Sequence, residues 1–110
     1  MTASAANRFS CPWLRGEIEL TTERERHIAD RHPDLLPAYR HRIAEVLADP
    51  DAVRRSPRSA TARLFSRWYS DIRRGRHIVV VVQGSAGRYW VVTAYTTRRL
   101  ATGEIEWQRN

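Results

Sequence analysis

The sequence predicts an α+β domain in which two N-terminal helices pack on a four-stranded antiparallel sheet. Between positions 20 and 47, apolar residues recur at intervals of three and four, which is typical of helices. From position 51 onward, apolar and polar residues alternate between turn signals, which is typical of strands. The 110 residues are the length of one domain, so we expect a single domain over 1–110. Residues 1–12 are expected to form a flexible N-terminal arm.

The first predicted helix begins near Thr22 and ends near His32. Thr22 is followed three positions later by Glu25, which is the spacing of a capping box. Pro33 has no backbone N–H and cannot continue the helix. Ile28 lies on the side of this helix that we expect to face the core.

Another face of the first helix carries Arg24, His27 and Arg31, which recur at helical spacing. Guanidinium groups bind phosphate through paired hydrogen bonds. An imidazole, with an unperturbed pKa of about 6.5, exchanges a proton near neutral pH. This face therefore suits chemistry on a phosphate, although a histidine on a polar helix face is more often simply solvated.

The second helix is predicted from Leu36 to Leu47, with Pro37 in its first turn. A short extended stretch, Glu17–Leu20, precedes the first helix. The face of the sheet away from the helices is expected to be rich in arginine. Strands are expected at 51–55, 60–70, 77–83 and 88–96, with a hairpin loop at 84–87 and 104–107 as a candidate last edge strand.

Charge is distributed unevenly along the chain. All 19 basic residues are arginine, and the net charge is +7. Residues 1–53 carry a net charge of −2, whereas residues 54–110 carry +9. Such a basic half predicts a polyanionic partner, most simply RNA. An acidic protein partner, such as an antitoxin or immunity protein, would satisfy the same field.

Composition also limits the classes of protein. Cys11 is the single cysteine, so the sequence holds no disulfide framework and no thiolate metal cluster. We find no apolar run long enough to cross a membrane and no apolar signal region, so we expect a cytoplasmic protein with no membrane partner. Its oligomeric state is left open by the sequence.

Metal and cofactor chemistry is poorly supported. His27 and His32 are five residues apart, whereas zinc pairs on helices are three or four apart. Neither a glycine-rich dinucleotide fingerprint nor a P-loop is present. We therefore expect neither a metal nor a cofactor.

A metal-independent ribonuclease fits these residues. The 2′-hydroxyl of RNA attacks the adjacent phosphorus, and the enzyme supplies a base, an acid and cations for the phosphate oxygens. Glu104 or Glu106 is an alternative base. The catalytic candidates are His27, His32, Arg31, Tyr95 and Thr96. The candidates for RNA binding are Arg24, Arg67, Trp68, Arg73, Arg74, Arg76, Arg98 and Arg99.

Two other functions remain open at this level. A non-catalytic RNA- or DNA-binding module would use the same arginines for phosphate. A protein whose basic face docks an acidic partner would need neither histidine.

Several strings resemble a family of small bacterial and phage-linked proteins, the phage barnase–EndoU–colicin–RelE-like (BECR-fold) nucleases. These strings are HIADRHPDLL, RLFSRWY, RYWVVTAYTTR and GEIEW, and the resemblance spans about Trp13 to Asn110. It implies helices on a four-stranded antiparallel sheet and metal-independent RNA cleavage, often by a toxin of a toxin–antitoxin pair. It points to His27, with His32 next, and to Tyr95 and Thr96. Because this chain has no lysine, any lysine role in relatives falls to an arginine or is absent.

Overall fold

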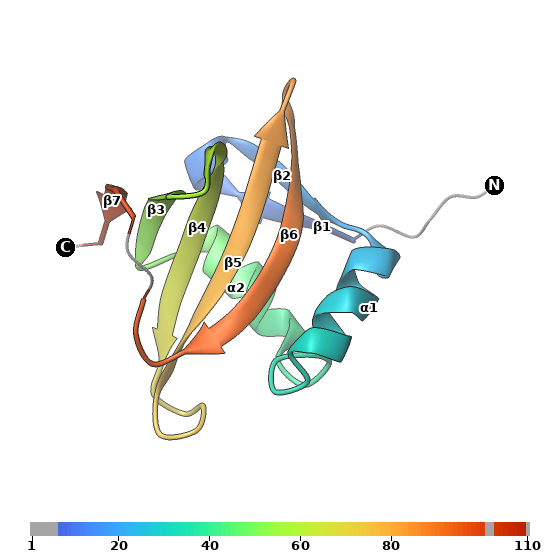
Figure 1. Cartoon of the computed structure of the whole chain (residues 1–110), viewed down its shortest axis with the longest axis vertical. Helices are drawn as coiled ribbons and strands as arrows, with labels where there is room; N and C mark the ends of the chain where they lie inside the picture. Colours follow the sequence, from blue (N-terminus) through green and yellow to red (C-terminus); the bar gives the residue numbers. More distant parts are fainter. Residues whose placement is uncertain (1–6, 101–102, 110) are drawn as a thin grey trace.

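The computed structural model describes residues 7–100 and 103–109, and Figure 1 shows their arrangement. In chain order the elements are β1 (Asn7–Cys11), the 3₁₀ turn η1 (Pro12–Leu14), β2 (Gly16–Leu20), α1 (Thr22–Arg31), α2 (Arg40–Ala48), β3 (Ala52–Ser56), β4 (Ser59–Tyr69), β5 (Arg76–Ser85), β6 (Arg88–Thr97) and β7 (Ile105–Gln108). No helix in these two ranges is long and apolar enough to span a membrane.

The predicted fold class is wrong. The described residues form a seven-stranded mixed sheet in the order β1-β2-β6-β5-β4-β3-β7, with two short helices. The sheet is larger than expected because the segment before α1 forms two strands and the C-terminal segment adds β7 beside β3. It is mixed because β2 pairs with β6 in parallel, at Glu19 and Trp90. The part of the expected N-terminal arm that is described, residues 7–12, pairs as β1 and enters η1.

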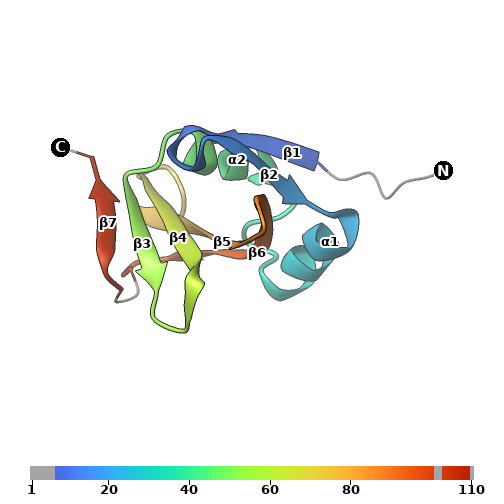
Figure 2. The ribbon, with the colours of Figure 1, turned by 90° about the horizontal axis from the view of Figure 1, so that it is seen from above.

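The central hairpins confirm the predicted alternation. β4 pairs with β5 and β5 with β6, both antiparallel, and β5 lies at the middle of the sheet. Phe65 pairs with Val80, and Val80 with Ala94, so all three point to one face. That face is buried under the helices, whereas the β3–β4 hairpin points away from them in Figure 2.

The core therefore lies on one face of the sheet. Phe65 is fully buried there, and Trp13 from η1 packs edge-on against it, with ring centroids 6.0 Å apart. From the helices, Ile28 and Ile43 are fully buried in the same cluster. The predicted direction of Ile28 is confirmed.

Helix α1 begins where the sequence predicts, but its cap differs. Thr21, not Thr22, is the N-cap, and its hydroxyl accepts the Arg24 backbone N–H at 3.1 Å. Glu25 does not close a capping box; its carboxylate accepts Arg40 Nε at 2.5 Å, which ties α1 to α2.

Helix α2 begins at Arg40, four residues later than predicted. Residues 33–39 form turns instead, and Pro37 lies in these turns rather than in the helix. The backbone explains the difference, because Leu35 N–H and Leu36 N–H both bind the His32 carbonyl, at 3.0 and 3.2 Å. The segment therefore folds back on the end of α1 before α2 can start.

We expect Tyr69 to make stability depend on alkaline pH. Its hydroxyl donates to Glu45 Oε1 at 2.8 Å, and burial, followed by this hydrogen bond, raises the pKa of Tyr69. A pKa raised in the folded state means that stability is intact below the unfolded value of about 10 and is lost above it. The melting temperature should therefore fall above pH 10.

Tyr69→Phe should reduce that alkaline fall and cost about 1.5–3 kcal/mol at pH 7, the worth of a hydrogen bond to a charged group. Thermal unfolding by circular dichroism between pH 7 and 11.5 measures both effects. An alkaline fall of the same size in the variant would show that another group is responsible. Burial also raises the pKa of Tyr95, so Tyr95→Phe is the matched comparison for the alkaline fall.

Candidate active site at the end of strand β6

The last residues of β6 point to opposite faces of the sheet. Thr96 pairs with Ile78, which is part of the core, whereas Tyr95 pairs with Val79 on the face away from the helices. β2 pairs with β6 only near Trp90, so α1 rather than a strand lies beside this end of β6 (Figure 1). The segment after α1 therefore reaches both side chains.

His32 lies next to Tyr95. The two ring centroids are 6.0 Å apart, with the planes tilted by 39°. His32 is the C-cap of α1, and its backbone N–H donates to the Ile28 carbonyl at 2.7 Å. The backbone of this histidine is thus fixed by the helix end and by the following turn, which holds the half-buried imidazole at the strand edge.

Asp34 contacts the end of β6 on the face to which Thr96 points. Thr96 Oγ1 donates to Asp34 Oδ2 at 2.5 Å, and Arg73 Nη1 is 3.9 Å from the same oxygen. The carboxylate therefore joins β6 to the loop between β4 and β5. Sequence reasoning missed Asp34, since it lies in a turn where the helical pattern has already ended.

Three arginines gather around Asp34. Arg76 Nη1 donates to the backbone carbonyls of Arg73, at 2.9 Å, and Gly75, at 2.8 Å. Desolvation lowers the pKa of Arg76, and the positive charges of Arg98 and Arg73 add to this effect. Three cations with one carboxylate leave a positive surface that favours an anion.

A groove of about 610 Å³ runs over the sheet face opposite the helices. Its described lining includes a single arginine, so the expectation of an arginine-rich face is wrong along this groove. The apolar part of the lining is Pro57, Ala62, Leu64, Val81 and Val92. The polar part is Ser56, Arg58, Ser59, Gln83, Thr93 and Tyr95.

Tyr95 connects the groove with His32. Burial raises the pKa of the Tyr95 hydroxyl, and the positive charge of Arg58, from the β3–β4 hairpin, opposes part of that effect. The phenol therefore keeps its proton at neutral pH and is a hydrogen-bond donor in the groove. Arg58 was not among the residues singled out from the sequence.

Four predicted residues are not brought to this site. The His27 side chain is exposed and, within residues 7–100 and 103–109, makes no hydrogen bond, ion pair or ring contact. Arg24 and Arg31 share its helix face, and among the same residues neither guanidinium has a hydrogen bond or an ion pair; the Arg24 backbone N–H donates to Thr21 Oγ1. Arg67 points to the helix side of the sheet, where Nη1 lies 3.4 Å from Asp49 Oδ2.

The remaining predicted residues lie around the site. Trp68 is 46% exposed and contacts His77 edge-on at 4.9 Å, on the same sheet face as Tyr95. Gly75 has a φ of +111°, and a Cβ there would come within 2.4 Å of the Trp68 ring, so the basic loop fits closely under the indole. Arg74 and Arg99 are exposed, and each follows a member of the arginine cluster, Arg73 or Arg98, in the chain.

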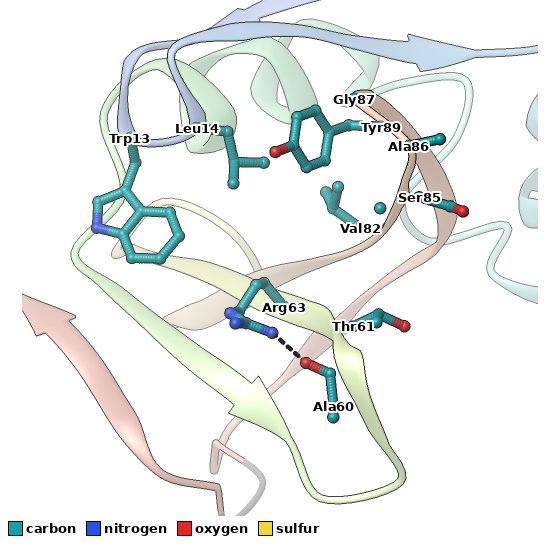
Figure 3. A pocket seen from close by; sticks show the side chains of 11 residues that line it. Trp13, Leu14, Ala60, Thr61, Arg63, Val82, Ser85, Ala86, Gly87 and Tyr89 are labelled. Atoms are coloured by element: carbon teal, nitrogen blue, oxygen red, sulfur yellow. Dashed lines mark hydrogen bonds between the residues drawn. The ribbon is translucent and has the colours of Figure 1, made fainter.

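A second cavity, of about 390 Å³, lies on the helix side between η1 and the β5–β6 hairpin. In Figure 3, Trp13 and Leu14 lie across it from Arg63. Arg63 Nη1 donates to the Ala60 carbonyl at 2.8 Å, and its Nε lies 2.5 Å from a Glu106 oxygen. With this guanidinium engaged and no histidine in the lining, the cavity is a weaker candidate than the groove.

Glu106 and Glu104, the alternative bases, lie in or next to β7, which β3, β4 and β5 separate from the strand that carries Tyr95. Glu106 is paired with Arg55 and Arg63, and Glu104 lies 3.8 Å from Arg55 Nη1.

Comparison of the chain with protein-family models, curated proteins and solved structures gives no match.

Proposed function

We propose that this protein is a metal-independent endoribonuclease that cleaves single-stranded RNA. One observation carries the proposal: the His32 imidazole lies against the phenol of Tyr95, which lines the groove, and Asp34, two positions after His32, lies beside Arg73. A proton acceptor, a proton donor and phosphate-binding cations are the groups that RNA cleavage requires.

The reaction follows from the positions of these groups. The 2′-oxygen forms a bond to the adjacent phosphorus while the bond from phosphorus to O5′ breaks. His32 takes the proton of the 2′-hydroxyl, and Tyr95 gives its proton to the leaving O5′. Proton exchange with solvent then restores both side chains. The products are a 2′,3′-cyclic phosphate and a 5′-hydroxyl.

The arginine cluster stabilises the charge that builds on the non-bridging oxygens. Arg73 is oriented by Asp34, which also fixes Thr96, so the carboxylate is a positioning residue rather than a catalytic one. An acidic inhibitor protein would bind to this same positive surface.

The test is cleavage of end-labelled single-stranded RNA by purified protein in the presence of EDTA. We expect strand breaks that persist with EDTA and leave 2′,3′-cyclic phosphate ends. A substrate with 2′-deoxyribose at the cleaved position should resist, because it lacks the nucleophile. Cleavage that EDTA abolishes, or that proceeds equally at the 2′-deoxy position, would contradict the proposal.

A non-catalytic RNA-binding module is the second candidate, and the exposed side chains of Arg74, Arg98 and Arg99 favour it. Such a module would retain RNA at low salt and release it steeply as salt rises, without breaking strands. The same reaction mixtures, run on a native gel and on a denaturing gel, separate the two functions.

A further inference from the structure

The side-chain amide of Gln83 is held in place at the wall of the groove. Its Nε2 donates to Thr61 Oγ1, and the Thr61 hydroxyl is 3.1 Å from Ser59 Oγ. Gln83 comes from β5 and the two hydroxyl residues from β4, so this contact joins two neighbouring strands. The second N–H and the carbonyl of this amide have hydrogen-bonding capacity left for a ligand.

The groove beside this amide combines a flat apolar floor with a few polar groups. Leu64 pairs with Val81 and Val81 with Thr93, so the three side chains form a row across β4, β5 and β6 on one face. Leu64 is 8% exposed although no helix covers this face. Thr93 and Tyr95 place hydroxyl groups at one side of the floor.

We propose that this groove binds one unpaired nucleobase of the RNA substrate, with Gln83 and Thr93 reading its hydrogen-bonding edge. The inference rests on the proposed function and adds the part of the substrate that sets specificity. The ring lies on Leu64 and Val81. Because Tyr95 lines the groove and contacts His32, the phosphate of the bound nucleotide lies at the reaction centre.

The chemistry of the lining favours a nucleobase over other occupants. An aliphatic chain would leave the polar groups of Gln83, Thr93 and Tyr95 unpaired, which is unfavourable. A heterocycle provides an apolar face for the floor and both donors and acceptors for the rim. Arg58 at the rim and the chain's net charge of +7 attract the phosphate that an unpaired base carries with it.

Amide NMR resonances test this inference directly. The chain has two glutamines, Gln83 and Gln108, and two asparagines, so the Gln83 side-chain signal is identified by its loss in Gln83→Leu. Each of the four nucleoside 3′-monophosphates is the probe. We expect at least one of them to shift the Gln83 signal in a saturable way and to leave the exposed Gln108 signal unchanged.

The same variants are then assayed for cleavage. Gln83→Leu should change the ratio of cleavage rates between the best and worst bases by about 10-fold, because an amide that pairs with a base edge discriminates between bases. Thr93→Val, which keeps the shape, should shift the ratio in the same sense. Gln108→Leu is the matched control and should leave it unchanged.

The outcomes separate the two proposals. Base-dependent shifts without cleavage would support the groove and contradict the ribonuclease. Cleavage with no shift from any mononucleotide, and with the same base ratio in Gln83→Leu and Thr93→Val, would overturn the groove and leave the ribonuclease standing.

Discussion

Replacing His32 with alanine is expected to lower the rate of RNA cleavage by about 10²–10⁴-fold, the usual worth of a general acid–base group. The imidazole is the proton acceptor beside Tyr95, and no other histidine has a ring contact with this tyrosine among the described residues. His27→Ala is the matched control. It removes an exposed imidazole five positions earlier on α1 and should change the rate by less than about twofold, since surface changes rarely matter.

The measurement is single-turnover cleavage, with thermal unfolding to show that both variants fold. His32→Ala should slow the cleavage step, whereas the RNA affinity of both variants should stay close to that of the wild type. Full activity in His32→Ala, or a larger loss in His27→Ala, would remove His32 from the reaction.

The contrast between the two histidines shows where helical spacing reaches its limit. Spacing correctly places Arg24, His27 and Arg31 on one face of α1. It does not decide which part of the helix meets a distant strand. That contact is set by the burial of Ile28 and by the turn after His32, which brings the C-terminal end of α1 to β6. Tertiary packing therefore places His32, and not His27, beside Tyr95.

Local patterns predicted most elements of the sheet but not its order. Alternation gave β3, β4, β5 and β6 nearly to the residue, because each pairs with its neighbour in the chain through a short turn. The pairing of β2 with β6 joins Glu19 to Trp90, and nothing local in either segment encodes it. The local β1–β2 hairpin, joined to β6, and the long-range pairing of β7 with β3 together make the sheet seven-stranded.

The groove could have been found in part from the sequence. Alternation within β6 places Thr93 and Tyr95 on a shared face. Counting from the 84–87 turn pairs Gln83 with Trp90 correctly, but it would pair Val81 with Val92; the register shift between Val81 and Val82 pairs Val81 with Thr93 instead. Arg58 lines the same groove as Tyr95, and it belongs to the β3–β4 hairpin, which points away from the helices (Figure 2); no local pattern reveals this.

Phe65→Ala is expected to produce the largest loss of stability, about 3–5 kcal/mol, the usual cost of truncating a buried phenylalanine. The side chain is fully buried under the helices and packs against Trp13 from η1. A small domain has a free energy of unfolding of about 5–15 kcal/mol, so this single change should remove a large share of it. Urea unfolding, followed by circular dichroism, measures the difference.

Leu64→Ala is the matched control, since Leu64 precedes Phe65 in β4 and points to the opposite face. Truncating it enlarges a groove that is already open to water, so no closed cavity forms and the cost should be clearly smaller. The change should instead weaken mononucleotide binding, because the floor loses its apolar surface. If Leu64→Ala cost as much stability as Phe65→Ala, Leu64 would be a core side chain rather than the floor of an open groove.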